Sequence, residues 1–307
     1  MLAGGLVPFL PGSTESPVVF GAEPPADAGR LPEDWTSFRN GRQLQGLAGT
    51  TLPEELELLW KHPAPDGFAS TAAITGGQVF AASLTGNLMC LDLKTGREIW
   101  NYRSIDSTDP DDFAPGFKAS PTVTETAVYI GDEDGVFHAV DRKTGKRRWK
   151  HVTGGEIVSS ATVLDGRVLF GSYDNSLYCL NEKDGTLAWS YATDGYVNCT
   201  PAVAGQYTFV TGCDEHLRVI DISTGKQHSV QNLMTYLIAS PAVDGNMLYV
   251  GTYASEVMAI NWESLEVVWR YKGAGRELPY HSSAALTEKY VIAGSRDKRM
   301  HCIDRET

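Results

Sequence analysis

The chain has 307 residues, of which 42% are hydrophobic and 21% charged, a balance that is typical of a folded protein and excludes a disordered one. Its 26 basic and 38 acidic residues give a formal net charge of −12 without a concentrated basic patch, so we expect no nucleic-acid partner. No apolar run reaches the ~18 residues of a membrane-spanning helix, so we expect no transmembrane span. The 31 glycines and seven tryptophans favour many short strands joined by tight turns.

Residues 1–30 have the character of a leader. Leu2–Leu10 is apolar, and Val19–Ala22 resembles the small-residue end of a secretory signal. A signal normally opens with Lys or Arg, whereas the first basic residue here is Arg30. We expect an exported protein, periplasmic or secreted; the alternative is a disordered tail rich in Pro, Gly and Ala.

One phrase then recurs six times, beginning at Ser70. Each copy has a short strand with Ser or Thr before Pro or Ala, an aromatic-rich strand, a polar turn and a strand that ends in Asp or Asn. The strand-ending residues follow at intervals of 49, 40, 40, 40 and 43 positions: Asp92, Asp141, Asn181, Asp221, Asn261 and Asp304. Eight residues after the first five stand Trp100, Trp149, Trp189, Ser229 and Trp269.

A period of ~40 residues with four short strands is typical of a propeller blade. Helical repeats of similar length would show an apolar period of ~3.6 residues instead. Asp165-Gly166 and Asp244-Gly245 stand where the first hairpin of a blade must reverse, and they tolerate the positive φ of a tight turn. We therefore predict an all-β protein, a β-propeller of four-stranded blades with six visible repeats, over residues 55–307, preceded by an N-terminal extension at 31–54.

The repeat resembles the pyrroloquinoline-quinone-like β-propeller repeat. The residues that carry the likeness in the second copy are Ser120-Pro121, Val128–Gly131, Asp134-Gly135, Ala139–Asp141, Thr144-Gly145 and Trp149. The resemblance covers about residues 55–307. It implies a family that includes quinoprotein dehydrogenases, the propeller lipoprotein of the outer-membrane β-barrel assembly machinery, and exported propellers without assigned chemistry. A shared fold does not choose among these functions.

Two ways of closing the ring are open. Trp60 lies eight residues before Phe68, as Trp149 lies eight before Ile157, so Leu56–Trp60 has the spacing of an outer strand. This segment would complete the last blade and clasp a closed six-bladed ring. The alternative, favoured because Thr307 falls inside the turn phrase, is a piece of the seven- or eight-bladed propeller that the resemblance implies. We also expect Asp34–Arg39 to pack its two aromatic side chains across the ring.

The innermost strands of a propeller line its central channel, which places one repeat position at the channel mouth. The position two residues before the recurring Ser or Thr reads Ala69, Lys118, Val158, Asn198, Ile238 and His281. We predict that the polar members, Lys118, Asn198 and His281, project into the channel and bind a small ligand or ion. The alternative is ordinary packing and solvent contact at the channel wall.

The five cysteines indicate no metal chemistry. Cys90, Cys179 and Cys302 share one repeat position and are predicted to be small buried core residues. Cys199 and Cys213 are predicted to be unpaired, because a disulfide there would need a bulge. Without a Cys-x-x-Cys motif we expect no zinc site.

The insertion Asn101–Gly116 gathers four carboxylates: Asp106, Asp109, Asp111 and Asp112. Carboxylate oxygens suit calcium, but the spacing lacks the Asp-x-Asp-x-Asp-Gly order and Pro110 interrupts it. We therefore predict a solvated acidic loop on the rim, suited to contact with a partner, and no metal site.

No His-Glu-x-x-His, Gly-x-Ser-x-Gly or phosphate-loop motif occurs. The resemblance to quinoprotein dehydrogenases implies an adjacent Cys-Cys pair and calcium ligands, neither of which this sequence matches, so we expect no cofactor. It also has no cysteine before Cys90 to carry a lipid anchor.

We predict a non-catalytic exported scaffold that binds proteins or peptides through its loops and channel mouth. The alternative is an enzyme that uses the channel, either a quinone-dependent dehydrogenase or a polysaccharide-acting hydrolase or lyase. A third hypothesis, an extracellular sensor module, would need a fused kinase or a membrane span.

Overall fold

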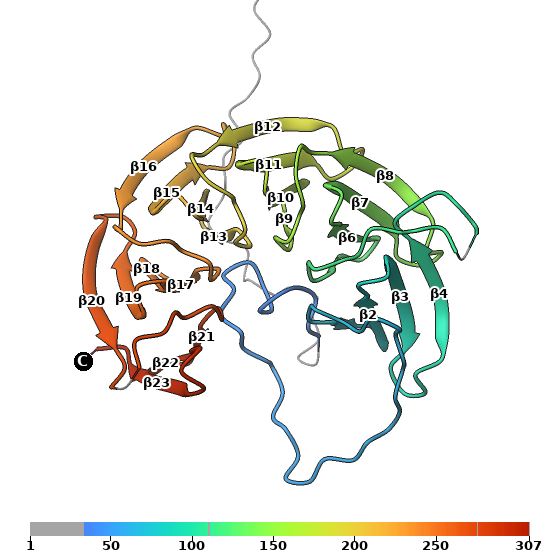
Figure 1. The fold of residues 1–307 in the computed structure, drawn as a ribbon, viewed down its shortest axis with the longest axis horizontal. Helices are drawn as coiled ribbons and strands as arrows, with labels where there is room; N and C mark the ends of the chain where they lie inside the picture. Colours follow the sequence, from blue (N-terminus) through green and yellow to red (C-terminus); the bar gives the residue numbers. More distant parts are fainter. Residues whose placement is uncertain (1–33, 110, 275, 307) are drawn as a thin grey trace, which may run out of the picture.

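The computed structural model describes residues 34–109, 111–274 and 276–306, so the predicted leader lies outside the described residues. Twenty-three strands form six antiparallel sheets, and the described residues contain no helix that could cross a membrane. In Figure 1 the sheets stand side by side along an arc, with the first strand of each toward the centre and the last at the rim. This arrangement confirms the predicted all-β propeller.

Each blade is a meander whose strands pair in chain order. The first two blades are β1 (Ala73–Thr75), β2 (Gln78–Ala82), β3 (Asn87–Asp92), β4 (Glu98–Arg103) and β5 (Thr122–Val123), β6 (Ala127–Gly131), β7 (Val136–Asp141), β8 (Arg147–Val152). The next two are β9 (Thr162–Leu164), β10 (Arg167–Ser172), β11 (Ser176–Asn181), β12 (Leu187–Ala192) and β13 (Ala202–Ala204), β14 (Tyr207–Thr211), β15 (His216–Asp221), β16 (Gln227–Asn232). The last two are β17 (Ala242–Asp244), β18 (Met247–Gly251), β19 (Glu256–Asn261), β20 (Glu266–Lys272) and β21 (Ala285–Leu286), β22 (Tyr290–Gly294), β23 (Met300–Asp304).

The core lies between the blades. Strand β6 is buried at every residue, whereas the outer strand β20 alternates between exposed and partly buried residues. Central strands covered by a neighbouring blade on both faces need apolar side chains on both faces, while an outer strand needs them on one. The mixed pattern of continuous and alternating apolar runs follows from this layering.

A tryptophan–glycine contact joins successive blades. Trp100 on β4 donates its indole N–H to the carbonyl of Arg142 at 2.9 Å, and its ring covers Gly145 in the β7–β8 turn. Gly145 has φ +69°, and a Cβ there would lie 2.8 Å from the ring. The same pair of interactions recurs at Trp149 with Gly185 and at Trp189 with Gly225. The tryptophan and Thr-Gly positions of the repeat are therefore two halves of one interface.

At the fourth blade both halves of this contact, the tryptophan and the glycine, are replaced. Ser229 stands at its tryptophan position, and the glycine position of the next turn is Leu265, at φ +61°. Trp262 fills the space instead: its ring lies 5.3 Å from that of Phe209, and its N–H donates to the Gly245 carbonyl at 3.0 Å. With no indole lying over the turn, the turn no longer requires glycine.

Trp60 occupies the predicted tryptophan position but not the predicted strand. Its indole N–H donates to the Leu93 carbonyl at 2.9 Å and its ring covers Gly96, as in the other blades. The clasp, the less favoured of the two alternatives, does not form: Leu56–Trp60 is not a strand, Leu56 is 74% exposed, and the last sheet has three strands among the described residues. The side-chain anchor of Trp60 holds one residue in place but supplies none of the backbone pairing that β23 would need.

A central segment, residues 35–46, links the inner strands across the middle of the arc, where Figure 1 shows the N-terminal part of the described chain. Its backbone bonds five of the six blades at 2.7–2.9 Å, through Ile74, Val123, Val203, Val243 and Leu286. Phe38 packs against the core of the fourth and fifth blades, whereas Trp35 pairs with Ile74 of the first. The side chain of Phe38 thus packs between blades as predicted, whereas Trp35 is placed by its backbone pairing.

The cysteines follow the prediction with one exception. Cys90 and Cys179 are buried, each opposite an outer-strand tryptophan, and Cys199 and Cys213 are free thiols. Cys302, predicted to be buried, is exposed. The physical reason is that β23 has no outer strand to cover it.

The tryptophan–glycine contact predicts a position-dependent cost of adding a methyl group. Gly145→Ala introduces both a positive-φ alanine and a clash with Trp100, whereas Gly166→Ala, at φ +74° with open space around its Cβ, introduces only the first. We expect the free energy of unfolding, measured by urea titration, to fall by about 1–3 kcal/mol more for Gly145→Ala. Equal losses in the two variants would show that the indole contact contributes nothing.

Deletion of residues 34–46 removes six backbone hydrogen bonds to the inner strands, each of which contributes about 1 kcal/mol. We expect the midpoint of thermal unfolding to fall by at least ~10 °C, with loss of a single cooperative transition. Deletion of residues 1–33, which removes none of these bonds, serves as the control. An unchanged midpoint after the first deletion would contradict a structural role for the central segment.

Candidate functional site: the channel mouth

The loop that leads from each outer strand into the next inner strand builds the channel mouth. Three residues before the recurring Ser or Thr, these loops carry a buried apolar anchor, such as Ile157 or Leu237. The anchor's N–H bonds to a backbone carbonyl of the preceding blade, that of Asp132 or Gly212, at 3.0 Å. Because both the side chain and the backbone of the anchor are fixed, the residue after it is held at the channel.

The structure brings the three predicted mouth residues together. Lys118, Asn198 and His281 line one cavity of about 200 Å³ at the centre of the arc. Phe38 of the central segment also lines it, as do the recurring Ser and Thr residues. That the three residues bind a ligand stays a prediction.

Lys118 is held by two carboxylates from neighbouring blades. Its ammonium lies 2.7 Å from a Glu133 oxygen and 2.8 Å from a Glu156 oxygen. The hydrogen bonds that Lys118 donates to Glu133 and then to Glu156 raise the pKa of Lys118 well above its usual range, so it stays protonated. These two carboxylates balance its charge. Lys118 therefore joins the loops at the mouth and is not available as a free cation.

Asn198 and His281 make fewer polar contacts than Lys118. The amide oxygen of Asn198 is buried and has no hydrogen-bond partner among the described residues. Burial, and then the charge of Arg296, lower the pKa of His281, so the imidazole is neutral at pH 7. The histidine ring stacks on Tyr253 with 6.0 Å between the centroids.

An aromatic crescent borders the mouth, which the sequence analysis missed. We define it as five residues: Tyr173, Tyr196, Tyr236, Tyr253 and His281. The rings of Tyr173 and Tyr196 stack at 4.8 Å, and Tyr236 meets Tyr253 edge-on at 6.4 Å. Tyr196, Tyr236 and Tyr253 are each about half exposed, at 51%, 48% and 49%. The available signal was tyrosine at matching loop positions of successive repeats.

Two buried histidines lie at interfaces between blades and not at the mouth. His138 lies 2.9 Å from an Asp132 oxygen and 2.8 Å from the Tyr102 hydroxyl, and it is fully buried. His301 repeats the arrangement with Asp297 and Tyr271 at 3.1 and 3.2 Å. Each links the outer strand of one blade to a turn of the next. Because His138 has no exposed surface, no substrate reaches it.

The acidic loop at 101–116 is organised by its own arginine. The Arg103 guanidinium donates to the carbonyls of Ser107, Asp109 and Asp112 at 3.2, 2.5 and 2.8 Å. Within residues 34–109, 111–274 and 276–306, no cluster of three His, Cys, Asp or Glu side chains is placed to hold a metal. Phe113, 80% exposed, adds an apolar group to this part of the rim.

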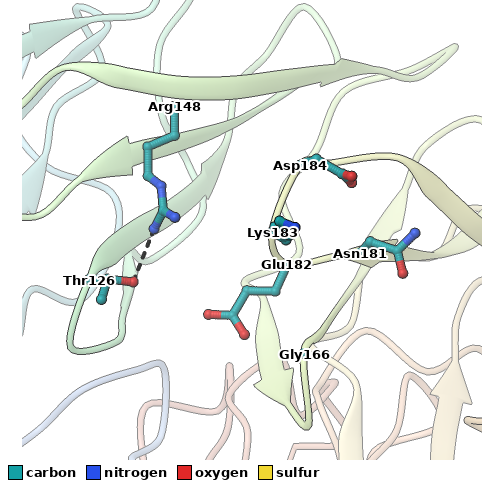
Figure 2. A pocket seen from close by; sticks show the side chains of 7 residues that line it. All are labelled: Thr126, Arg148, Gly166, Asn181, Glu182, Lys183 and Asp184. Carbon is teal, nitrogen blue, oxygen red and sulfur yellow. Dashed lines mark hydrogen bonds between the residues drawn. The ribbon is translucent and has the colours of Figure 1, made fainter.

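A rim cleft of about 400 Å³ lies between the second and third blades, lined by Thr126, Arg148 and the turn at Glu182. Figure 2 shows Arg148 bonded to Thr126 on one side of it, with 3.0 Å between the bonded atoms, and the Glu182 carboxylate facing the open space from the other side. A cleft of about 500 Å³ recurs between the fifth and sixth blades, lined by Arg305 and its neighbours. We attribute both to the geometry of adjoining blades, because they occur at equivalent places.

The residues at the mouth do not fit a calcium-bound quinone. Calcium is held mainly by carboxylate and carbonyl oxygens, and among the described residues no Asp or Glu lines the cavity. The cysteines occupy five separate positions, so an adjacent pair is absent from the sequence. We therefore derive no reaction step through such a group.

Comparison with known proteins connects this fold to one family and two kinds of relative. The family model described as outer membrane protein assembly factor BamB matches residues 53–163, 103–203, 153–230 and 195–307. An outer membrane protein assembly factor BamB of Xanthomonas campestris pv. campestris is 30% identical over 95 residues, which are 31% of this chain and 23% of that protein. A polyvinylalcohol dehydrogenase of a Sphingopyxis species is 25% identical over 144 residues, 45% of this chain and 22% of the dehydrogenase.

The matched segments thus span less than a quarter of the length of either relative. Among solved structures, BamB from Moraxella catarrhalis superposes with a TM-score of 0.68 at 17% identity. The superposition covers 80% of this chain and 76% of that one. At this identity the likeness establishes the fold alone.

Proposed function

The chain belongs to the β-propeller family described as outer membrane protein assembly factor BamB, and from that premise we propose that it is a non-catalytic scaffold that binds other proteins or peptides at its channel mouth. We further propose that it acts after export, in the periplasm or outside the cell. Relatives named as assembly factors support both parts, since such factors act on other proteins.

The aromatic crescent is the observation that carries this proposal. Tyrosine offers a large contact area with few rotatable bonds, and it is enriched in protein-binding sites. Tyr236 and Tyr253 are joined by a backbone hydrogen bond of 3.0 Å, so their rings are presented by a fixed loop pair. Met234, 80% exposed, extends the apolar surface beside them. A rigid, partly apolar rim suits an extended polypeptide.

The enzyme alternative has less support from the residues at the mouth. Similarity to quinone-dependent and polyvinylalcohol dehydrogenases keeps it open. The cavity, however, has no carboxylate in its lining to hold calcium or to act as a general base. A polysaccharide-acting enzyme would need a pair of carboxylates flanking the bond to be cleaved.

The proposal predicts that an extended peptide binds at the crescent. The probe is a labelled peptide with alternating apolar and polar residues, the pattern of a membrane-barrel strand. We expect the double variant Tyr236→Ser/Tyr253→Ser to weaken binding, measured by fluorescence anisotropy, by at least ~10-fold, because buried tyrosine contacts dominate such interfaces. Tyr290→Ser, at a 37% exposed tyrosine on β22 outside the crescent, should stay within about twofold.

Equal affinity of the wild type and the double variant would rule out the crescent as the binding surface. The enzyme alternative is tested in parallel, by adding pyrroloquinoline quinone, calcium and a primary alcohol and following the reduction of a dye. Alcohol-dependent reduction would contradict a non-catalytic role.

A further inference from the structure

A ring of hydroxyl groups surrounds the cavity at the channel mouth. The backbone N–H of each of the first five recurring Ser and Thr residues donates to the hydroxyl of its counterpart in the next blade at 2.8–3.2 Å, beginning at Thr71. The accepting hydroxyls, which we call the hydroxyl ring, are those of Ser120, Ser160, Thr200, Ser240 and Ser283. All five residues line the cavity, and the first four are more than 90% buried.

Each hydroxyl of the ring is available as a hydrogen-bond donor. A serine or threonine hydroxyl carries one proton to donate in addition to the lone pairs that accept bonds. Across the described parts of the chain, each ring hydroxyl accepts a backbone bond and none donates its proton to a protein acceptor. Buried donors normally find an acceptor. Five such donors therefore face a cavity that a ligand rich in acceptors would satisfy.

The guanidinium of Arg39, which is not itself among the residues that line the cavity, lies beside this ring. Arg39 of the central segment donates one N–H to the carbonyl of Ser283, a member of the ring. Its Nε is buried without a partner, and within the described residues no carboxylate lies within 4.0 Å of the group. An unpaired cation in a partly buried position is costly, and a nearby anion offsets that cost.

The cavity lining adds to this polarity. In the part of the chain that the structure describes, no Asp or Glu lines it, although the whole protein has 38 acidic residues and a net charge of −12. Asn198 contributes an amide whose Nδ2 lies 4.0 Å from the Cys213 sulfur and whose oxygen is an unpartnered acceptor, and the neutral imidazole of His281 contributes one further N–H. Lys118 is balanced by Glu133 and Glu156, whereas Arg39 has no carboxylate partner within residues 34–109, 111–274 and 276–306. Five hydroxyl donors against one free acceptor, the Asn198 oxygen, with the Arg39 charge beside the ring, are the chemistry of an anion site.

We infer that the channel cavity binds a carboxylate group, with the hydroxyl ring donating to its oxygens and Arg39 balancing its charge. A volume of about 200 Å³ corresponds to roughly six or seven water molecules, so it accommodates a chain end or a side chain rather than an extended chain. For a polypeptide partner, an inference that rests on the proposed function, the group is a C-terminal or side-chain carboxylate. A free small carboxylate presents the same chemistry without a partner chain.

Two probes distinguish these sources. The first is the labelled strand peptide, compared as the free acid and as the amide at its C-terminus. The second is succinate compared with succinamide, titrated calorimetrically into the full chain. We expect each acid to bind at least ~10-fold more tightly than its amide, because charge-assisted hydrogen bonds are about twice as strong as neutral ones.

Variants then locate the site. Arg39→Gln should weaken succinate binding by about tenfold, whereas Arg148→Gln, at an exposed rim arginine, should leave it within about twofold. Because Arg39 also bonds Ser283 and its replacement can disturb the fold, Asn198→Leu provides a second reading with an expected loss of about threefold. Asn101→Leu, on the exposed face of β4, is its control.

The outcomes separate the two proposals. If acid and amide peptides bind equally at the crescent, the carboxylate inference is overturned and the scaffold function stands. If succinate binds in an Arg39-dependent manner and neither peptide binds, the carboxylate site stands and the scaffold function fails. Succinate affinity that is unchanged in both Arg39→Gln and Asn198→Leu overturns the site.

Discussion

The contact between an outer-strand tryptophan and the glycine turn of the next blade is the interaction on which the rest of the structure depends. It fixes how far apart neighbouring blades stand, because an indole ring and a Cβ cannot occupy the same space above Gly145. Where the tryptophan is lost at Ser229, Trp262 restores the packing from the other blade. Equal spacing at the rim places the inner strands in the same register at the centre. In that register, the recurring serine and threonine hydroxyls of successive blades lie next to one another around the channel.

The two ends of the channel differ as a result. The central segment bonds residues such as Val203 and Val243, three positions beyond the hydroxyl ring in each inner strand, and its Phe38 reaches the cavity from that side. The mouth end carries the aromatic crescent, the balanced Lys118 and the cavity. A partner that uses the channel therefore approaches from the mouth. The aromatic rings at the rim would contact the body of a bound chain, and the hydrogen-bond donors in the cavity would contact its end.

Spacing alone was sufficient to predict the fold and the meeting of Lys118, Asn198 and His281 in one cavity, because a repeat carries equivalent positions to equivalent places. What spacing could not show are contacts between blades. The pairing of Lys118 with Glu133 and Glu156, and the stacking within the crescent, depend on how loops of different blades meet. Leu56–Trp60 failed as a predicted strand for a related reason. A tryptophan at the correct spacing predicts its own side-chain contact but not the backbone pairing of the segment around it.

The account's central claim is that the mouth face is the binding face, and hydrogen–deuterium exchange with and without the strand peptide tests it most directly. The account predicts slower exchange on peptide binding in the mouth loops at residues 233–239 and 252–254, because both carry crescent tyrosines. It predicts unchanged exchange in the turns that hold Gly96 and Gly145, at the opposite ends of the blades. Protection of those turns with no change in the mouth loops would contradict it.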